Sequence, residues 1–160
     1  MKLTPSLKGF ITAFVMIALV LGIYYSKRTP ETNLQYLIYI IYALGIAWTL
    51  IAYRQSSFFT GKFADAFGQG FRCFIVVTLL MVLFTGIFSK MHPEFAEETS
   101  IAYREQLVQQ NDKTPTEIEK EVTDFKKQYT LKLISGSIFG YLILGAAVTA
   151  TVAALLTRRK

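Results

Sequence analysis

Apolar residues fall into four long runs along the chain, and shorter polar segments separate them. The runs cover residues 9–25, 34–53, 71–88 and 133–156, so each has between 17 and 24 residues. At about 1.5 Å per residue, helices of this length come near or exceed the ~30 Å hydrocarbon core of a bilayer. Within lipid, only a helix satisfies its backbone hydrogen bonds inside one segment, and the sequence lacks the alternation typical of barrel strands. The pattern therefore predicts an all-α fold, an integral membrane four-helix bundle.

The composition supports one membrane domain over residues 1–160. Hydrophobic residues make up 52% of the chain, which is high for a soluble domain of this size. The first run follows a short basic start and resembles a secretory signal in that respect. However, Tyr24 and Tyr25 stand where such a signal has small residues for cleavage. We therefore expect residues 9–25 to remain in the protein as a span.

The polar segment between the third and fourth runs, residues 91–130, has the pattern of a helical hairpin outside the membrane. Pro93 can begin a helix whose first turn is acidic. After a polar turn, Thr114 and Glu117 have the spacing of a capping box, with Pro115 at the first helical position. One face of the second helix is then apolar, with Ile118, Val122, Phe125 and Tyr129. No later proline interrupts this helix, which can continue into the fourth span.

Charge is distributed unevenly along the chain, and this distribution argues against a nucleic-acid partner. The formal net charge is +6, yet nine of the eleven acids lie between Lys90 and Lys132, beside seven Lys or Arg. The remaining ten cations lie in short flanks next to the predicted spans. Such an arrangement is typical of membrane-flanking charge, whereas a nucleic-acid surface needs a continuous basic groove.

The flanking cations also predict the orientation of the chain. An even number of spans places both termini on one side. Eight cations lie on that side: Lys2, Lys8, Arg54, Lys62, Arg72, Arg158, Arg159 and Lys160. Lys27 and Arg28 argue for the opposite orientation, but they are fewer. By the positive-inside rule, we expect cytoplasmic termini in a bacterial inner membrane and a hairpin on the other side.

Residues 58–70 form a phenylalanine-rich amphipathic segment before the third span. Phe59, Phe63, Phe67 and Phe71 recur every four residues, so on a helix they form one apolar stripe. The segment is either a separate helix in the membrane interface or the first turns of a long third helix, and both alternatives stay open here. In either case these phenylalanines are the predicted interfacial anchor.

Two further sets of residues are predicted to pack helices together. Tyr39 and Tyr42 lie deep in the second span, where each hydroxyl needs a partner on a neighbouring helix. We favour packing over a polar ligand pocket for this pair. Gly136 and Gly140 form a GxxxG motif in the fourth span, which lets helix backbones approach closely, within the chain or between copies.

The sequence contains no recognisable catalytic or metal-binding pattern. Cys73 is the lone cysteine, and we interpret it as a small core residue. His92 has no acid or nucleophile grouped with it in a known motif, and P-loop, GxSxG and HExxH motifs are absent. The predicted spans contain no Asp, Glu, Lys or His in their interiors, which argues against an ion-coupled transporter. We therefore expect no catalytic residue, cofactor or metal.

These observations predict a non-enzymatic membrane protein with a structural or partner-binding role. Its contacts would be the lipid bilayer and, through residues 91–130, a membrane protein partner or a second copy of the chain. A solvated hairpin without a partner is the simpler interpretation of that segment. The alternative function is a small transporter, channel component or lipid-handling protein that uses the face of Tyr39 and Tyr42 or an oligomeric pore.

Several short motifs occur in an order that resembles a known family. They are Tyr53 and Arg54 at the end of the second run, "AFGQGF" from Ala66 to Phe71 before the third, and "HPEF" from His92 before the acidic insert. In this order the chain, from about Lys8 to Lys160, resembles a bacterial membrane family known only as domain of unknown function 4199. The resemblance implies four spans in an inner membrane. It implies no activity, so no functional residue is transferred from it.

Overall fold

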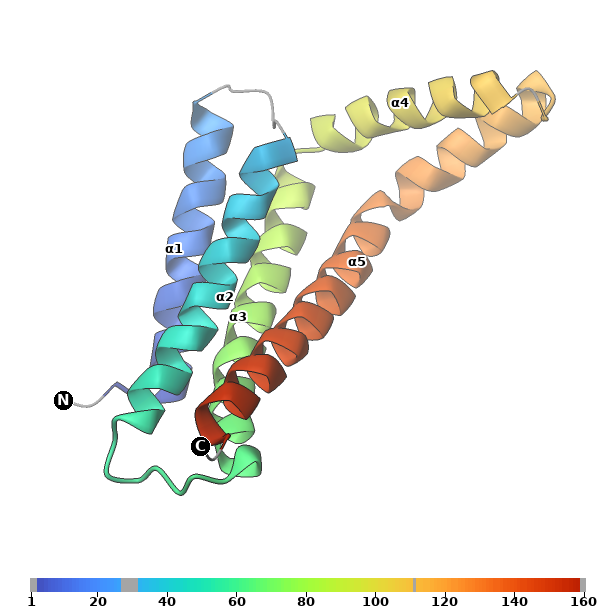
Figure 1. Cartoon of the computed structure of the whole chain (residues 1–160). Helices are drawn as coiled ribbons and strands as arrows, with labels where there is room; N and C mark the ends of the chain where they lie inside the picture. Colours follow the sequence, from blue (N-terminus) through green and yellow to red (C-terminus); the bar gives the residue numbers. More distant parts are fainter. Residues whose placement is uncertain (1–2, 27–31, 111, 159–160) are drawn as a thin grey trace. The chain divides into compact units, whose positions relative to one another are not determined.

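The chain folds into five α-helices in a computed structural model (Figure 1), which describes residues 3–26, 32–110 and 112–158. The helices are α1 (Pro5–Tyr25), α2 (Thr32–Arg54), α3 (Phe63–Met91), α4 (Glu94–Gln110) and α5 (Pro115–Thr157). No strand occurs in these described ranges. Four of the helices, all but α4, are long and apolar enough to cross a membrane. The prediction of an all-α membrane protein with four spans is confirmed.

α1 begins four residues before the predicted first span. Thr4 caps the helix, since its side-chain oxygen accepts a hydrogen bond from the backbone N–H of Leu7 (3.3 Å), and Pro5 occupies the first helical turn. As a result, Lys8 lies inside α1, at the end of its first turn, and not in a flank before it.

α3 also begins before the predicted span, at Phe63, and continues without interruption past Gly68 and Gly70. Residues 63–70 are therefore the first turns of a long third helix, which was one of the two alternatives for the phenylalanine-rich segment. Phe59 precedes the helix and lies in the loop, so the helical stripe consists of Phe63, Phe67 and Phe71 only.

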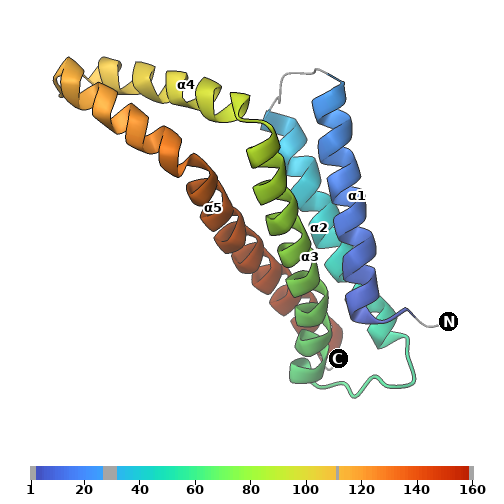
Figure 2. The same ribbon diagram turned by 180° about the vertical axis from the view of Figure 1, so that it is seen from behind.

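The chain divides into two compact units, to both of which α3 and α5 contribute. Unit 1 comprises Met1–Met81 and Ile138–Lys160, and unit 2 comprises Val82–Ser137. In unit 1, α1 and α2 run side by side, and the start of α1 and the end of α5 lie at the same end as the α2–α3 loop (Figures 1 and 2). That placement agrees with an even number of membrane crossings.

The core of unit 1 is formed by apolar side chains from α1, α2, α3 and α5. Its fully buried members include Met16, Tyr42, Ile46, Leu50 and Val77. The outer surface is apolar too: Phe14 on α1 is 74% exposed and Ile143 on α5 is 68% exposed. Because water would disfavour so much apolar surface, the unit is suited to lipid contact.

Unit 2 contains the helical hairpin, in which α4 packs against the first part of α5. The rings of Tyr103 and Phe125 stack with their centroids 4.5 Å apart, and Leu107 and Ile118 are buried nearby. Thus the predicted apolar face of α5 is covered by α4. The end of α3 also belongs to this unit, where Ser89 Oγ and Thr130 Oγ1 form a hydrogen bond of 3.1 Å.

The turn between α4 and α5 has the predicted capping box. The backbone N–H and the hydroxyl of Thr114 both donate to the Glu117 carboxylate, at 2.9 and 2.8 Å. In return, the Glu117 N–H donates to Thr114 Oγ1 (3.4 Å). From Pro115, α5 continues as one helix for 43 residues, so the expected continuity with the fourth span is confirmed.

Five of the ten cations used to predict orientation lie outside the described residues. They are Lys2, Lys27, Arg28, Arg159 and Lys160. Orientation in the membrane therefore stays a prediction from charge. The five cations that the structure describes on the terminal side are Lys8, Arg54, Lys62, Arg72 and Arg158.

Candidate functional site

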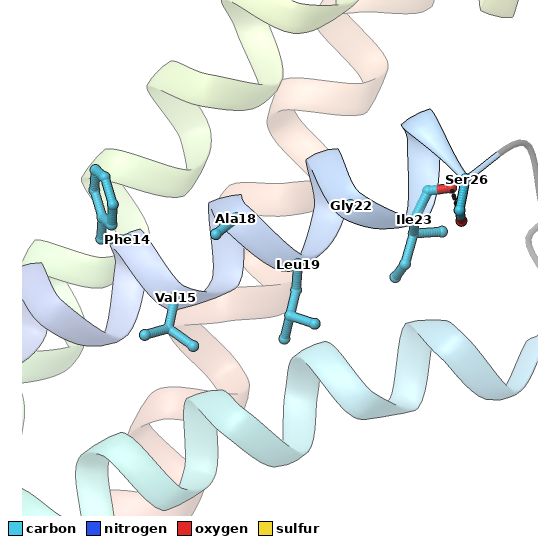
Figure 3. Close-up of a pocket in the computed structure, with 7 residues that line it drawn as sticks. All are labelled: Phe14, Val15, Ala18, Leu19, Gly22, Ile23 and Ser26. Atoms are coloured by element: carbon cyan, nitrogen blue, oxygen red, sulfur yellow. Dashed lines mark hydrogen bonds between the residues drawn. The ribbon is translucent and has the colours of Figure 1, made fainter.

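A groove in unit 1 runs along one side of α1 (Figure 3). It has a volume of about 600 Å³ and is lined by Phe14, Val15, Ala18, Leu19, Gly22, Ile23 and Ser26. The single polar side chain, Ser26, is already used, because its hydroxyl donates to the carbonyl oxygen of Ile23 (2.9 Å). The groove is an apolar surface without reactive groups.

The predicted tyrosine pair packs α2 against α5. Tyr42 is fully buried, its hydroxyl donates to the carbonyl oxygen of Tyr141 (2.9 Å), and the two rings meet edge to face. Tyr39 is partly exposed, and its ring centroid is 6.2 Å from that of Tyr141. Tyr141, which belongs to no motif in the sequence, completes a three-tyrosine cluster that joins α2 and α5.

Within the described chain, neither glycine of the GxxxG motif makes a close contact with another helix. A Cβ atom at Gly136 or Gly140 would meet no described atom within 4 Å. Further along α5, a Cβ atom at Gly145 would collide with the Tyr42 hydroxyl and approach Phe74 Cγ to 2.8 Å. Gly145 therefore allows α5 to approach α2 and α3 closely, and Gly70 on α3 does the same opposite Thr149 of α5, where a Cβ atom would meet Thr149 Cγ2 at 2.4 Å.

The predicted anchor phenylalanines are divided between contact with the protein and exposure. Phe63 and Phe71 are each 46% exposed on α3, whereas Phe67 is partly buried against the core of unit 1. Phe63 and Phe67 stack with centroids 5.8 Å apart. In the loop, Phe59 packs edge to face on Tyr53. Exposed aromatic rings on one side of α3 suit the interface between lipid and water.

The Cys73 thiol and the His92 imidazole each contact another side chain of the protein. Cys73 is buried, and its sulfur lies 3.3 Å from the hydroxyl of Thr49. His92 Nδ1 is 2.7 Å from Glu94 Oε1, next to it on the turn into α4. Across the described residues, no three His, Cys, Asp or Glu side chains are grouped so that they could hold a metal ion.

Lys8 is an unexpected feature of unit 1, since this cation is only 8% exposed. Its Nζ lies over the ring of Trp48, 5.5 Å from the centroid, in a cation–π contact between α1 and α2. Trp48 also lines an apolar crevice of about 270 Å³ between these helices. The helix-start signal of Thr4 and Pro5 could have placed Lys8 inside α1 from the sequence.

In unit 2, three ion pairs between described residues lie in the α4–α5 hairpin. Ion pairs join Arg104 to Glu119, Lys126 to Glu97 and Lys113 to Glu121. The Glu121 carboxylate accepts two hydrogen bonds from Lys113, at 2.6 and 2.7 Å, which raises the pKa of Lys113.

A comparison with models of known protein families shows which family the chain belongs to. The model of a family described as "Protein of unknown function (DUF4199)" matches residues 7–158, nearly the whole chain. The chain belongs to the DUF4199 family. No curated protein and no solved structure is detectably similar to it. DUF4199 membership confirms the predicted family but supplies no activity.

For this DUF4199 chain, a functional hypothesis must rest on surfaces of its own structure. In unit 2 the relevant surface is the side of α4 turned away from α5, which we call the outer face of α4. It consists of Glu98, Ile101, Glu105 and Val108, which are all exposed. In unit 1 it is the crevice between α1 and α2 that Trp48 lines, together with Lys8, which lies over the Trp48 ring.

Proposed function

We propose that the protein is a non-enzymatic component of a bacterial inner membrane that binds a partner protein through the outer face of α4. Both termini are cytoplasmic in this proposal, and the hairpin of α4 and the first part of α5 faces the periplasm. The observation that carries the proposal is a helix face on which exposed aliphatic side chains alternate with acids that have no ion pair among the described residues.

The spacing of the outer face is that of a helix recognition surface. At 100° per residue, Glu98, Ile101, Glu105 and Val108 lie within about 80° of one another around α4. Ile101 is 53% exposed and Val108 is 54% exposed, outside the predicted spans. A partner of matching chemistry carries Lys or Arg beside apolar side chains, because its cations would meet the two carboxylates.

The rest of the hairpin supports this proposal, since it is already organised before any partner arrives. The stacked Tyr103 and Phe125, together with buried Leu107 and Ile118, hold α4 against α5. A preformed helix loses less conformational entropy on binding than a disordered segment does. The outer face is therefore suited to docking as a rigid surface.

The partner proposal is tested by site-specific photocrosslinking in cells. A photoreactive amino acid at Ile101 is expected to form a discrete adduct, whereas the same group at exposed Lys127 on α5 is the matched control. Glu105→Lys should abolish the Ile101 adduct by repelling a basic partner, and Asp124→Lys, a charge reversal on α5, should leave it intact. An Ile101 adduct no stronger than the Lys127 adduct would refute the proposal.

The same experiment distinguishes two kinds of partner. An adduct with twice the mass of the chain would identify a second copy, which is the homo-oligomer alternative. Any other discrete mass would identify a different protein, to be named by mass spectrometry of the adduct.

The proposed orientation has a separate test. Cysteines introduced at Asp112 and at Lys160, in a Cys73→Ala background, are labelled with a membrane-impermeant maleimide. The Asp112→Cys thiol should react from the periplasmic side and the Lys160→Cys thiol only after the inner membrane is opened. Labelling of both from one side would contradict four spans.

A second candidate function, lipid handling, is favoured by one observation in unit 1. The crevice is lined mainly by apolar side chains, and one of them, Trp48, has the Lys8 ammonium over its ring, 5.5 Å from the centroid. A small transporter or channel component has no comparable support in the described residues.

A further inference from the structure

Lys8 is a buried cation without a neutralising carboxylate in the described structure. All four ion pairs between described residues lie in the range from His92 to Lys126. Within the described part of unit 1, Asp65 is the sole acid, and it accepts a hydrogen bond from the hydroxyl of Thr60 (2.6 Å). Because an uncompensated buried charge is unfavourable, Lys8 would gain from an anion supplied by another molecule.

The surroundings of Lys8 show which kind of anion fits. Along α1, Lys8, Ile11 and Val15 lie on one side of the helix, at spacings of three and four residues. Ile11 and Val15 line the crevice together with Leu44 and Trp48 of α2, and all four are exposed at its mouth. The site thus combines one cation with an adjoining open apolar surface.

The close approach of α1 to α2 forms the floor of this crevice. A Cβ atom at Gly45 would collide with the side chain of Thr12, which is buried directly below. The Thr12 hydroxyl donates to the carbonyl oxygen of Lys8 (2.9 Å), so it is satisfied within α1. The floor therefore offers an entering molecule no free hydroxyl from Thr12, and recognition must come from Lys8 and the apolar walls.

We propose that this crevice binds an anionic phospholipid. The phosphate of the lipid contacts the Lys8 ammonium beside the Trp48 indole, and one acyl chain of the lipid lies along Ile11, Val15 and Leu44. Tryptophan is common at headgroup depth, which suits this placement. A zwitterionic lipid brings its own cation next to the phosphate, so it compensates Lys8 less well. The proposal concerns unit 1 alone and does not depend on a partner at α4.

The chain has a built-in reporter for this site, because Trp48 is its one tryptophan. Purified protein is reconstituted in bilayers that contain phospholipid with brominated acyl chains, which quench tryptophan fluorescence on contact. At equal mole fractions, brominated phosphatidylglycerol should show about fivefold higher relative affinity at Trp48 than brominated phosphatidylcholine, the preference expected from about one basic residue.

Two charge variants test the role of Lys8. Lys8→Gln is expected to remove the preference for phosphatidylglycerol, so that the two lipids have about equal affinity at Trp48. Lys8→Arg is expected to keep the preference. Arg54→Gln removes an exposed cation at the end of α2, away from the crevice, and should leave the preference unchanged. If Lys8→Gln does not accumulate, Lys8→Arg and the wild-type comparison still decide the question.

A relocated tryptophan controls for general enrichment of anionic lipid around a basic protein. The double variant Trp48→Phe with Phe14→Trp places the reporter on an exposed part of α1 outside the crevice. That reporter should show no headgroup preference. Equal quenching of wild-type Trp48 by both lipids would overturn the proposal. A preference for phosphatidylglycerol at the relocated tryptophan, equal to that at Trp48, would also overturn it. So would a preference for phosphatidylglycerol that persists in Lys8→Gln.

Discussion

Units 1 and 2 are built from helices of the same chain, and α5 contributes to both, yet different interactions hold them. The five described cations of unit 1 on the terminal side form no ion pair with described residues, and apart from Lys8 its buried side chains are apolar or have only a hydroxyl or thiol group. Unit 2 has all four described ion pairs and exposes most of its acids. The part of α5 in unit 1 therefore has the apolar character that suits lipid, and the part in unit 2 has the charged character that suits water.

This difference predicts which substitutions each unit tolerates. In lipid, apolar side chains gain little by leaving the solvent, so close packing of small residues decides whether helices associate. In water, the burial of apolar side chains stabilises a fold more than exposed ion pairs do. Unit 1 should be sensitive to added volume, and unit 2 to lost apolar contact.

The largest effect is expected from added volume in unit 1, at Gly145. Gly145→Leu forces the new side chain against Tyr42 and Phe74, which are both buried. Overpacking of this kind costs about 3 kcal/mol, corresponding to a fall in Tm of about 5–10 °C. Thermal unfolding in detergent measures it.

Gly140→Leu is the matched control, because a Cβ atom there meets no described atom within 4 Å. Its Tm should stay close to that of the wild type. A fall in Tm as large as that of Gly145→Leu would contradict the prediction, because added volume would then destabilise unit 1 even at a glycine that contacts no other helix. A smaller oligomer with an unchanged Tm would instead identify Gly140 as a contact between copies.

A smaller and local effect is expected from the loss of an apolar contact in unit 2. Phe125→Ala removes the ring that stacks on Tyr103, at a cost of about 1–3 kcal/mol. Amide hydrogen exchange should accelerate about tenfold or more in α4 and remain unchanged in α2. Ile101→Ala, on the outer face of α4, serves as the control and should leave the exchange of α4 as it is.

Features of the fold that depend on local sequence could be predicted. The capping box of Thr114 and Glu117 and the unbroken course of α5 follow from residues adjacent in the chain. The four spans follow from apolar length. In contrast, the apolar run alone predicts a start for α1 that is four residues too late, because it begins after Lys8, whereas Thr4 and Pro5 mark the true helix start.

The contacts between helices could not be predicted, because they depend on the rotation and register of each helix. The spacing of Gly136 and Gly140 fits a known motif, but spacing alone does not show which side of α5 faces α2. Gly145 makes that contact, and Tyr141 supplies the carbonyl oxygen for Tyr42. Likewise, the burial of Lys8 beside Trp48 depends on two helices that are distant in sequence.

The smallest effect is expected from removing an ion pair in unit 2. Arg104 and Glu119 pair across the hairpin with both side chains more than half exposed, so solvent screens their attraction. Arg104→Gln should change the amide exchange of α4 less than about twofold, and 0.5 M salt should remove even that difference. Lys120→Gln, which alters an exposed cation without a described ion pair, gives the background. If Arg104→Gln instead accelerated amide exchange in α4 as much as Phe125→Ala does, ion pairs would hold the hairpin together. The two units would then differ in their dependence on ion pairs, and not in their response to lost or added apolar volume.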